Sequence, residues 1–194
     1  MKATLEQSVS SDHSVYVPAR PPFSLEAVMC SHGWIRLVPF GEDEATGGFT
    51  YVTRLGSGRI VRLLMQETTR GVDINVDNHQ GDLTSDERAD VARQVTWMLS
   101  LNQDLTDFYA LARDEPKLAH VESQAKGRLL RCPTLFEDTV KTILTTNTSW
   151  AGTIRMVGAL VSKFGDPLPS DRERHAFPVP DRLAATDEET LRNE

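Results

Sequence analysis

The most informative part of the chain reads GRLLRCPTLFEDTVKTILTTNTSWAGTIRMVGALVSKFG, residues 127–165. Its apolar residues recur every three or four positions, as in helices that bury one face. Two stripes result, one of Phe136, Val140, Ile143 and Leu144 and one of Trp150, Ile154, Val157, Val161 and Phe164. The polar run 145–149 between them has helix N-cap chemistry, and Gly165 followed by Pro167 ends the second stripe. The segment therefore predicts two helices joined by a polar break.

Residues 23–80 have the pattern of β-strands. The stretches GGFTYVTRL and RIVRLLMQ flank a Gly56-Ser57-Gly58 turn signal, which is typical of a hairpin. The stretch GVDINVD alternates apolar and polar residues, and a further strand is expected around WIRLVPF. An antiparallel sheet of about four or five strands is predicted.

The period changes to that of helices at Asp82. Thr84 and Glu87 have the spacing of a capping box, and helices are expected near residues 85–101 and 105–113. The predicted fold class is α+β, with the sheet packed on these helices and an all-helical portion after it. Residues 1–21, polar and with no signal-peptide pattern, are expected to form a mobile tail.

A second capping-box pattern, Thr186-Asp187-Glu188-Glu189, predicts a helix near the end of the chain. Only five residues follow Glu189, and a helix that short has almost no stability of its own. We therefore expect a fragment that stops inside an element. Part of the apolar face of residues 150–161 would then be exposed or covered by self-association.

Composition places the chain among globular proteins, with 39% apolar and 25% charged residues. The two cysteines, Cys30 and Cys132, provide neither a disulfide framework nor a CxxC motif. No apolar run is long enough to span a membrane, and a cytoplasmic, nucleoid-associated location is expected. The net charge of −7 argues against a nucleic-acid partner, but residues 126–165 hold six Lys and Arg against two acids. This basic island is typical of a surface that meets phosphate, although chance clustering on a solvated surface is the alternative.

The sequence predicts no cofactor and no metal site. Asp73, Asn75 and Asp77 alternate with Ile74 and Val76, which favours a polar strand face over a calcium loop. The five histidines show no ligand spacing. Glu137 and Asp138 are adjacent, so on a helix they point in different directions. No catalytic constellation is visible.

With these motifs, residues 127–165 resemble the opening of the glycosylase domain of the HhH-GPD superfamily of base-excision DNA glycosylases, which includes 8-oxoguanine and 3-methyladenine DNA glycosylases. FSLEAVMCSHGWIRL resembles the start of the sheet that precedes this domain in the larger branches. The resemblance implies a TBP-like α+β N-terminal domain over residues 22–120. It also implies the beginning of a helical domain over residues 121–194.

The resemblance also implies site residues. Asn147 corresponds to the residue that fills the gap left by a flipped base; a plain N-cap is the alternative. The backbone amides of Thr148, Ser149 and Trp150 would hold a phosphate. Arg128 and Arg131 would contact DNA phosphates or remain a solvated pair, and Lys141 pairs with Glu137. The base pocket would include Cys30, Ser31 and His32, with a functionless buried Cys30 as the alternative.

The leading hypothesis is a DNA repair enzyme that hydrolyses the N-glycosidic bond of a damaged, flipped-out base in double-stranded DNA. The hairpin and the catalytic Asp or Lys of the family are missing from this chain, so we expect it to be inactive alone and assign no catalytic residue. The alternatives are a non-catalytic module that binds DNA or a partner, and an α+β protein that matches the pattern by chance. The sequence does not assign which damaged base is excised.

Overall fold

The computed structural model describes residues 13–77 and 81–192, except for the side chain of residue 192. The main sheet consists of β1 (Ser14–Pro18), β2 (Phe40–Asp43), β3 (Gly48–Arg54), β4 (Ile60–Thr68) and β5 (Gly71–Asp77). The helices are α1 (Leu25–Met29), the 3-10 helix η2 (Gly33–Arg36), α2 (Ser85–Met98), α3 (Thr106–Arg113), α4 (Leu135–Ile143), α5 (Trp150–Phe164), α6 (Pro180–Ala184) and α7 (Glu188–Arg192). A second, two-stranded sheet joins β6 (Asp166–Leu168) and β7 (Asp171–Ala176). None of the helices in the described ranges combines the length and the apolar character needed to cross a bilayer.

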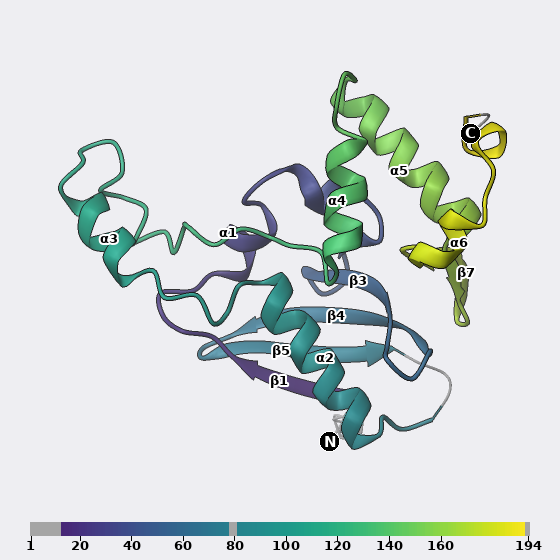
Figure 1. Cartoon of the computed structure of the whole chain (residues 1–194). Coiled ribbons are helices and arrows are strands. Elements are labelled where there is room, and N and C mark those ends of the chain that lie inside the picture. Colours follow the sequence, from purple (N-terminus) through teal and green to yellow (C-terminus); the bar gives the residue numbers. More distant parts are fainter. Residues whose placement is uncertain (1–12, 78–80, 193–194) are drawn as a thin grey trace.

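The predicted antiparallel sheet is confirmed. Its strand order is β1-β5-β4-β3-β2, and every neighbouring pair is antiparallel. Helix α2 lies across one face (Figure 1) and buries Val91, Val95 and Met98 against the sheet. The capping box is also confirmed, because Thr84 Oγ1 accepts from the Glu87 amide (3.2 Å) and Glu87 Oε2 accepts from the Thr84 amide (3.0 Å).

Residues 23–37 were expected to begin the sheet, and this is wrong. They form α1 and η2 instead, and no strand starts before Phe40 on this stretch. The Ser24 side chain caps α1 by accepting from the Ala27 amide (3.2 Å). Leu25, Val28 and Met29 then point into the core. This short helix is stabilised by tertiary burial, because a single turn or so has little stability of its own.

The expected tail includes a strand. Ser14–Pro18 form β1 at the edge of the sheet and pair with β5, with Val15 and Val17 buried. The alternation of Tyr16 with the two valines is that of a half-buried strand. The part of the predicted tail before residue 13 lies outside the described residues.

The portion after residue 121 is not all helical. Strands β6 and β7 form a hairpin after α5, and Leu168 and Ala176 pack on Val52 and Ile60 of the main sheet. Gly165 ends α5 as predicted. A Cβ at Gly165 would lie 2.3 Å from the Ala176 carbonyl oxygen, so glycine lets α5 and β7 approach closely.

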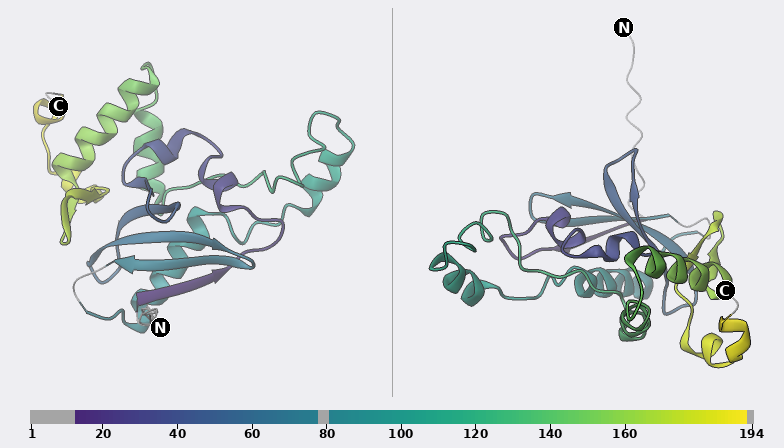
Figure 2. Two further views of the ribbon diagram at one scale, coloured as in Figure 1. Left: turned by 180° about the vertical axis from the view of Figure 1, so that it is seen from behind. Right: turned by 90° about the horizontal axis from the view of Figure 1, so that it is seen from above.

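Helix α3 does not pack on the sheet as expected. It projects to one side (Figures 1 and 2) and forms a separate cluster with Leu105, Tyr109, Ala112 and Val121. At the other end of the chain, α7 is capped by Asp187, which accepts from the Thr190 amide (2.8 Å), and not by Thr186.

The apolar stripe of α5 is buried at Val157 and Val161 and half-buried at Trp150 and Ile154. Val157 and Val161 are buried together with Leu37 and Phe177, and Trp34 packs against this cluster. The exposed apolar side chains of the helical pair lie instead on α4, where Leu135 is 77% and Ile143 is 60% exposed.

Candidate nucleic-acid interface

Helices α4 and α5 form a hairpin closed by the polar loop that the sequence predicted. Thr134 caps α4 by accepting from the Glu137 amide (3.2 Å), and Ser149 caps α5 by accepting from the Gly152 amide (3.2 Å). Thr153 Oγ1 donates to the Leu144 carbonyl (3.0 Å) and links the two helices across the loop. The loop shape is therefore set by local hydrogen bonds.

Asn147 lies at the exposed turn of this loop. Its φ of 52° is in the left-handed region, which Asn tolerates better than most residues. Ser149 is the N-cap of α5, so the plain N-cap alternative for Asn147 is wrong. Within the described residues, its side-chain amide has no hydrogen-bond partner. The donor and acceptor groups of Asn147 are therefore available to a ligand.

The start of α5 is suited to an anion. Within the described part of the chain, no group accepts a hydrogen bond from the backbone amides of Thr148, Ser149 or Trp150. Thr148 and Ser149 are exposed, and Trp150 is half-buried. Unpaired amides and the positive end of the helix dipole both favour a phosphate at this position.

The two predicted phosphate-binding arginines have different environments. Arg128 is buried, with 2% exposure, and donates to the carbonyl oxygens of Ser100 (2.9 Å), Gln103 (2.8 Å) and Arg20 (2.9 Å). Its guanidinium joins three backbone segments, so the predicted phosphate contact and the solvated pair are both wrong for Arg128. Arg131 is half-buried and stacks on the exposed ring of Trp97, 4.6 Å from its centroid.

The residues predicted to line a base pocket lie against this same segment. Ser31 Oγ accepts from the Leu130 amide (3.0 Å), and His32 Nε2 lies 2.8 Å from the Leu130 carbonyl oxygen. Because a carbonyl only accepts, Nε2 carries a proton. Cys30 is exposed, which removes the alternative that it is simply a buried residue. Partial burial, Glu26 and Glu42 raise the pKa of its thiol, so it is not an activated nucleophile.

Two cavities flank this contact. One of about 600 Å³ is lined by residues that include Cys30, Ser31 and Lys126. The other, of about 260 Å³, is lined by residues that include His32 and Arg131. The structure therefore places Cys30–His32 and Arg131 at two adjacent cavities that share Gly127 and Leu129 in their walls and are together called the groove, although Leu130 is 98 positions from His32 in the sequence.

Comparison of the coordinates with solved structures identifies similar folds. The 3-methyladenine DNA glycosylase of Archaeoglobus fulgidus superposes with a TM-score of 0.71 at 20% identity, covering 92% of this chain and 60% of that one. The chain shares its fold with about three fifths of this DNA glycosylase. The structure of MBOgg1 with a low-affinity DNA ligand gives a TM-score of 0.68 at 21% identity, over 100% and 60% of the two chains. The 8-oxoguanine glycosylase/lyase of Clostridium acetobutylicum gives 0.66 at 18% identity, over 93% and 57%.

The chain spans about three fifths of the length of these glycosylases. No model of a known protein family matches its sequence, and no characterised protein does so either. The likeness to these glycosylases is therefore one of fold, as the low identities indicate.

This chain also contains a buried ion pair where α4 meets the sheet. Lys141 Nζ donates to Glu137 Oε1 (2.6 Å), and Tyr51 donates to Glu137 Oε2 (2.6 Å). Lys141 is 0% and Glu137 2% exposed. The pairing was predicted, but its burial was not. Burial, followed by the charge of Glu137, raises the pKa of Tyr51 well above its ordinary value, so this hydroxyl remains a donor.

Aromatic side chains surround the Lys141 ammonium. Its Nζ lies 4.9 Å from the Phe40 ring centroid, 5.6 Å from that of Phe177 and 6.0 Å from that of Trp34. Burial raises the pKa of the nearby Cys132 thiol, so this cysteine stays protonated. The cluster joins β2, β3, η2 and α4 and excludes water from the junction.

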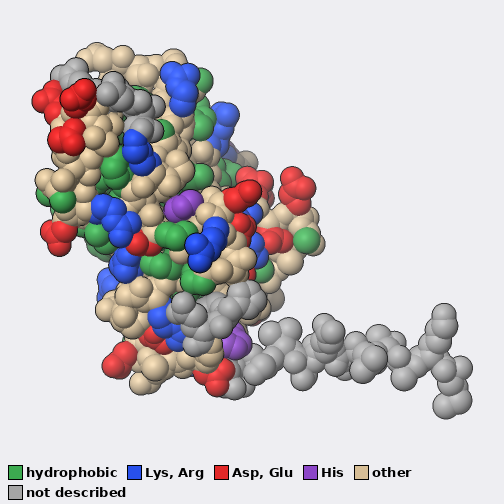
Figure 3. Space-filling model, turned by 90° about the vertical axis from the view of Figure 1, so that its right-hand side faces the viewer, with side chains coloured by type: hydrophobic (Ala, Val, Ile, Leu, Met, Phe, Trp, Pro, Cys, Tyr) green, Lys and Arg blue, Asp and Glu red, His purple; other side chains and the backbone are tan. Residues whose placement is uncertain are grey.

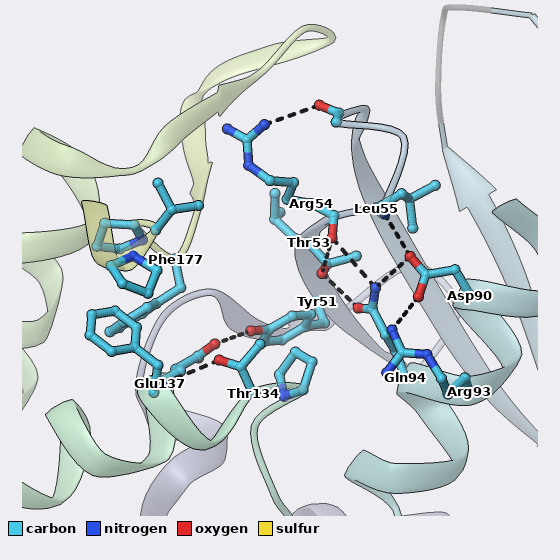
Figure 4. Close-up of a pocket in the computed structure, with 18 residues that line it drawn as sticks. Tyr51, Thr53, Arg54, Leu55, Asp90, Arg93, Gln94, Thr134, Glu137 and Phe177 are labelled. Atoms are coloured by element: carbon cyan, nitrogen blue, oxygen red, sulfur yellow. Dashed lines mark hydrogen bonds and ion pairs between the residues drawn. The ribbon is translucent and has the colours of Figure 1, made fainter. Parts of the chain in front are cut away.

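A cavity of about 450 Å³ opens beside Glu137 and Tyr51 (Figure 4). Sequence reasoning missed it because its walls come from β3, α2, the start of α4 and residues 177–180. Its polar groups largely satisfy one another: Thr53 Oγ1 donates to Gln94 Oε1 (2.7 Å), and Asp90 accepts from the Gly56 amide (2.7 Å) and from Arg93. The cavity therefore presents mainly aromatic and proline side chains, among them Phe136, Phe177 and Pro178.

Burial reduces the exposed charge of the basic island, residues 126–165. Two of its six cations, Arg128 and Lys141, are in the interior, whereas Lys126 and Arg155 are exposed. On the face that carries the C-terminal elements, Lys and Arg side chains are spread out and Asp and Glu gather at the rim (Figure 3). The exposed positive charge is therefore moderate and dispersed.

Proposed function

We propose that this chain binds double-stranded DNA and forms part of a base-excision DNA glycosylase, an enzyme that hydrolyses the N-glycosidic bond of a damaged, flipped-out base. The observation that carries this proposal is Asn147, exposed and unpaired within the described residues at the tip of a helix hairpin in a glycosylase fold. Two of the similar structures are DNA complexes, with a low-affinity DNA ligand for MBOgg1 and with double-stranded DNA that has cytosine opposite 8-oxoguanine for the Clostridium acetobutylicum enzyme.

Asn147 is proposed to occupy the space left when a base leaves the helix. A flipped base leaves a gap opposite its partner, and filling that gap offsets part of the cost of unstacking. The Asn amide is small enough to enter and offers both donors and acceptors to the orphaned base. The amides of residues 148–150 and the guanidinium of Arg131 would hold the adjacent phosphates.

The groove at Cys30, Ser31 and His32 is proposed to receive the flipped base. Ser31 uses only its acceptor capacity on Leu130, so its hydroxyl hydrogen remains free to donate. His32 uses Nε2 on the Leu130 carbonyl, which leaves Nδ1 as an acceptor. Ser31, at the 600 Å³ cavity, therefore offers a donor, and His32 Nδ1, on the side of the 260 Å³ cavity, offers an acceptor when the ring is neutral, a combination that suits the polar edge of a base. The boundary between an N-terminal domain over residues 22–120 and a helical domain over residues 121–194 also remains a prediction.

The role of Asn147 is tested by binding to duplexes with and without an abasic site. We expect Asn147→Gly to weaken binding to the abasic duplex about tenfold and to change binding to the intact duplex little. Glycine is chosen because it accepts the left-handed conformation without strain. Fluorescence anisotropy with labelled duplexes measures both affinities.

The matched control is Asn102→Gly, which removes an exposed amide elsewhere. Affinity for both duplexes should fall about 40-fold between about 50 and 200 mM salt if about three phosphates are contacted. Equal binding of Asn147→Gly and the wild-type chain to the abasic duplex would remove the proposed role. Salt-independent binding would remove the phosphate contacts.

We further propose that the 194-residue polypeptide alone excises neither 8-oxoguanine nor 3-methyladenine. Departure of the base requires negative charge held against a developing cation in a dry pocket. The carboxylates at the 450 Å³ cavity, Glu137 and Asp90, are paired with Lys141 and Arg93. Glu26, at the base groove, is exposed to water.

Incubation of the purified chain with lesion-containing duplexes, followed by detection of abasic sites, tests this proposal. No turnover is expected. Turnover that is lost in Glu26→Gln or Asp90→Asn would show that the chain holds an active site. The same carboxylate pairing supports the second candidate, a non-catalytic DNA- or partner-binding module. Equal affinity for damaged, abasic and intact duplexes would favour that module over the enzyme.

A further inference from the structure

Gly33 and Trp150 are in unusually close contact. A Cβ at Gly33 would lie 2.6 Å from Trp150 Cζ2 and 3.0 Å from Cη2, closer than Cβ atoms approach other groups. The backbone of Gly33 does not adopt a positive φ, so its conformation does not demand glycine. The missing side chain therefore serves to admit the indole ring.

The half-buried indole also packs against a buried cluster. Trp150 packs against the cluster of Leu37, Val157, Val161 and Phe177, to which Trp34 also belongs. A side chain at position 33 would therefore push Trp150 against neighbours that are themselves packed. Trp150 is the first residue of α5, directly after the Ser149 cap, so displacement of its ring displaces the start of the helix.

The residues on either side of Gly33 are fixed to other parts of the site. His32 bonds the Leu130 carbonyl (2.8 Å), and its ring lies edge-on to Trp34 (5.1 Å between centroids). Trp34 in turn lies 6.0 Å from the Lys141 ammonium. The backbone at Gly33 is therefore held on both sides, by the contact of His32 with Leu130 at the groove and by the contact of Trp34 with Lys141 of α4.

We infer that Trp150 is a positioning residue for Asn147, and that the absence of a side chain at Gly33 makes room for the Trp150 ring. The hydrogen bonds from Thr153 to Leu144 and from Gly152 to Ser149 set the shape of the loop. They do not set its place relative to residues 30–34, whereas the Trp150–Gly33 contact does. The contact thereby fixes the separation between the inserted Asn147 and the groove that receives the base. This inference rests on the proposed function.

The test is Gly33→Ala in the full chain. Amide hydrogen exchange at the start of α5, where the amides of Gly152 and Thr153 donate to Ser149, should become about tenfold faster, and the preference for an abasic over an intact duplex should fall about tenfold. Gly158→Ala is the matched control, because it adds the same methyl group on α5 where nothing lies within 4 Å. It should behave like the wild-type chain in both measurements.

Trp150→Phe separates positioning from general stability. Phenylalanine lacks the outer ring atoms that meet a Cβ at position 33, so the double variant Gly33→Ala/Trp150→Phe should recover most of the exchange protection and of the duplex preference. If Gly33→Ala alone does not fold, recovery of folding in the double variant supports the inference. Failure of the double variant to improve on Gly33→Ala overturns it.

Two further results are distinguishable. Wild-type exchange and duplex preference in Gly33→Ala would overturn the positioning role. A wild-type chain without preference for the abasic duplex would overturn the proposed function instead. The exchange measurement, which needs no DNA, would then still decide whether Gly33 and Trp150 hold the loop in place.

Discussion

Lys141→Met is expected to lower the free energy of unfolding by about 3–5 kcal/mol, because it leaves the Glu137 carboxylate buried without its partner. Methionine has nearly the length of lysine, so the aromatic surroundings of Phe40, Phe177 and Trp34 stay filled. The remaining donor to Glu137 is Tyr51 (2.6 Å), and a single hydroxyl does not offset the loss of an ammonium ion. Urea unfolding followed by tryptophan fluorescence measures the change.

Two comparison variants make this result specific. Lys126→Met removes an exposed lysine of the same basic island and should cost under about 1 kcal/mol. Glu137→Gln/Lys141→Met removes both charges and should be less destabilised than Lys141→Met alone. A loss for Lys141→Met as small as that for Lys126→Met would contradict the buried ion pair.

Arg128→Lys is expected to lower the free energy of unfolding by about 2–4 kcal/mol although it keeps the positive charge. The two terminal nitrogens of Arg128 reach three carbonyl oxygens, on Ser100, Gln103 and Arg20. One ammonium group cannot reproduce this forked geometry, and the carbonyls are left without their donor.

The matched variant is Arg131→Lys in the same segment. Arg131 stacks on an exposed Trp97, and such a contact contributes only about 0.5–1 kcal/mol. Arg131→Lys should therefore change stability little, whereas Arg131→Ala should weaken DNA binding. If Arg128→Lys left stability unchanged and altered only the affinity for DNA, the structural role of Arg128 would be wrong and the original phosphate contact correct.

Local sequence patterns were sufficient to predict helices α2, α4 and α5 and strands β3 to β5. The Thr84 cap, an N-cap within residues 145–149 and the alternation of Val72, Ile74 and Val76 are fixed by near neighbours in the chain, and the structure confirms each of them. The short elements were missed for a physical reason. Residues 25–29 are helical because Leu25, Val28 and Met29 are buried by the sheet, and nothing within the segment itself distinguishes this from a buried strand.

The site was less predictable than the fold. The exposed loop around Asn147 follows from polar residues between two apolar stripes, so it could be located from the sequence. The burial of Arg128 and Lys141 could not be predicted, because the sequence alone does not distinguish a charged residue in solvent from one in the interior. Arg128 is buried through its contact with Ser100, and Lys141 through its contact with Glu137. Ser100 lies in a segment 28 residues away from Arg128.

The junction between the sheet and the helical hairpin is made of contacts that are distant along the chain. Tyr51 and Glu137 are 86 residues apart, and Leu130 is 98 residues from His32 and 99 from Ser31. Strands β2 to β5 follow one another directly, and a short loop joins α4 to α5. Contacts between distant residues carry the largest chain-closure entropy and form slowly. The meander and the helix pair can thus assemble early, and Lys141 and Glu137 stay hydrated until the last docking step removes their water.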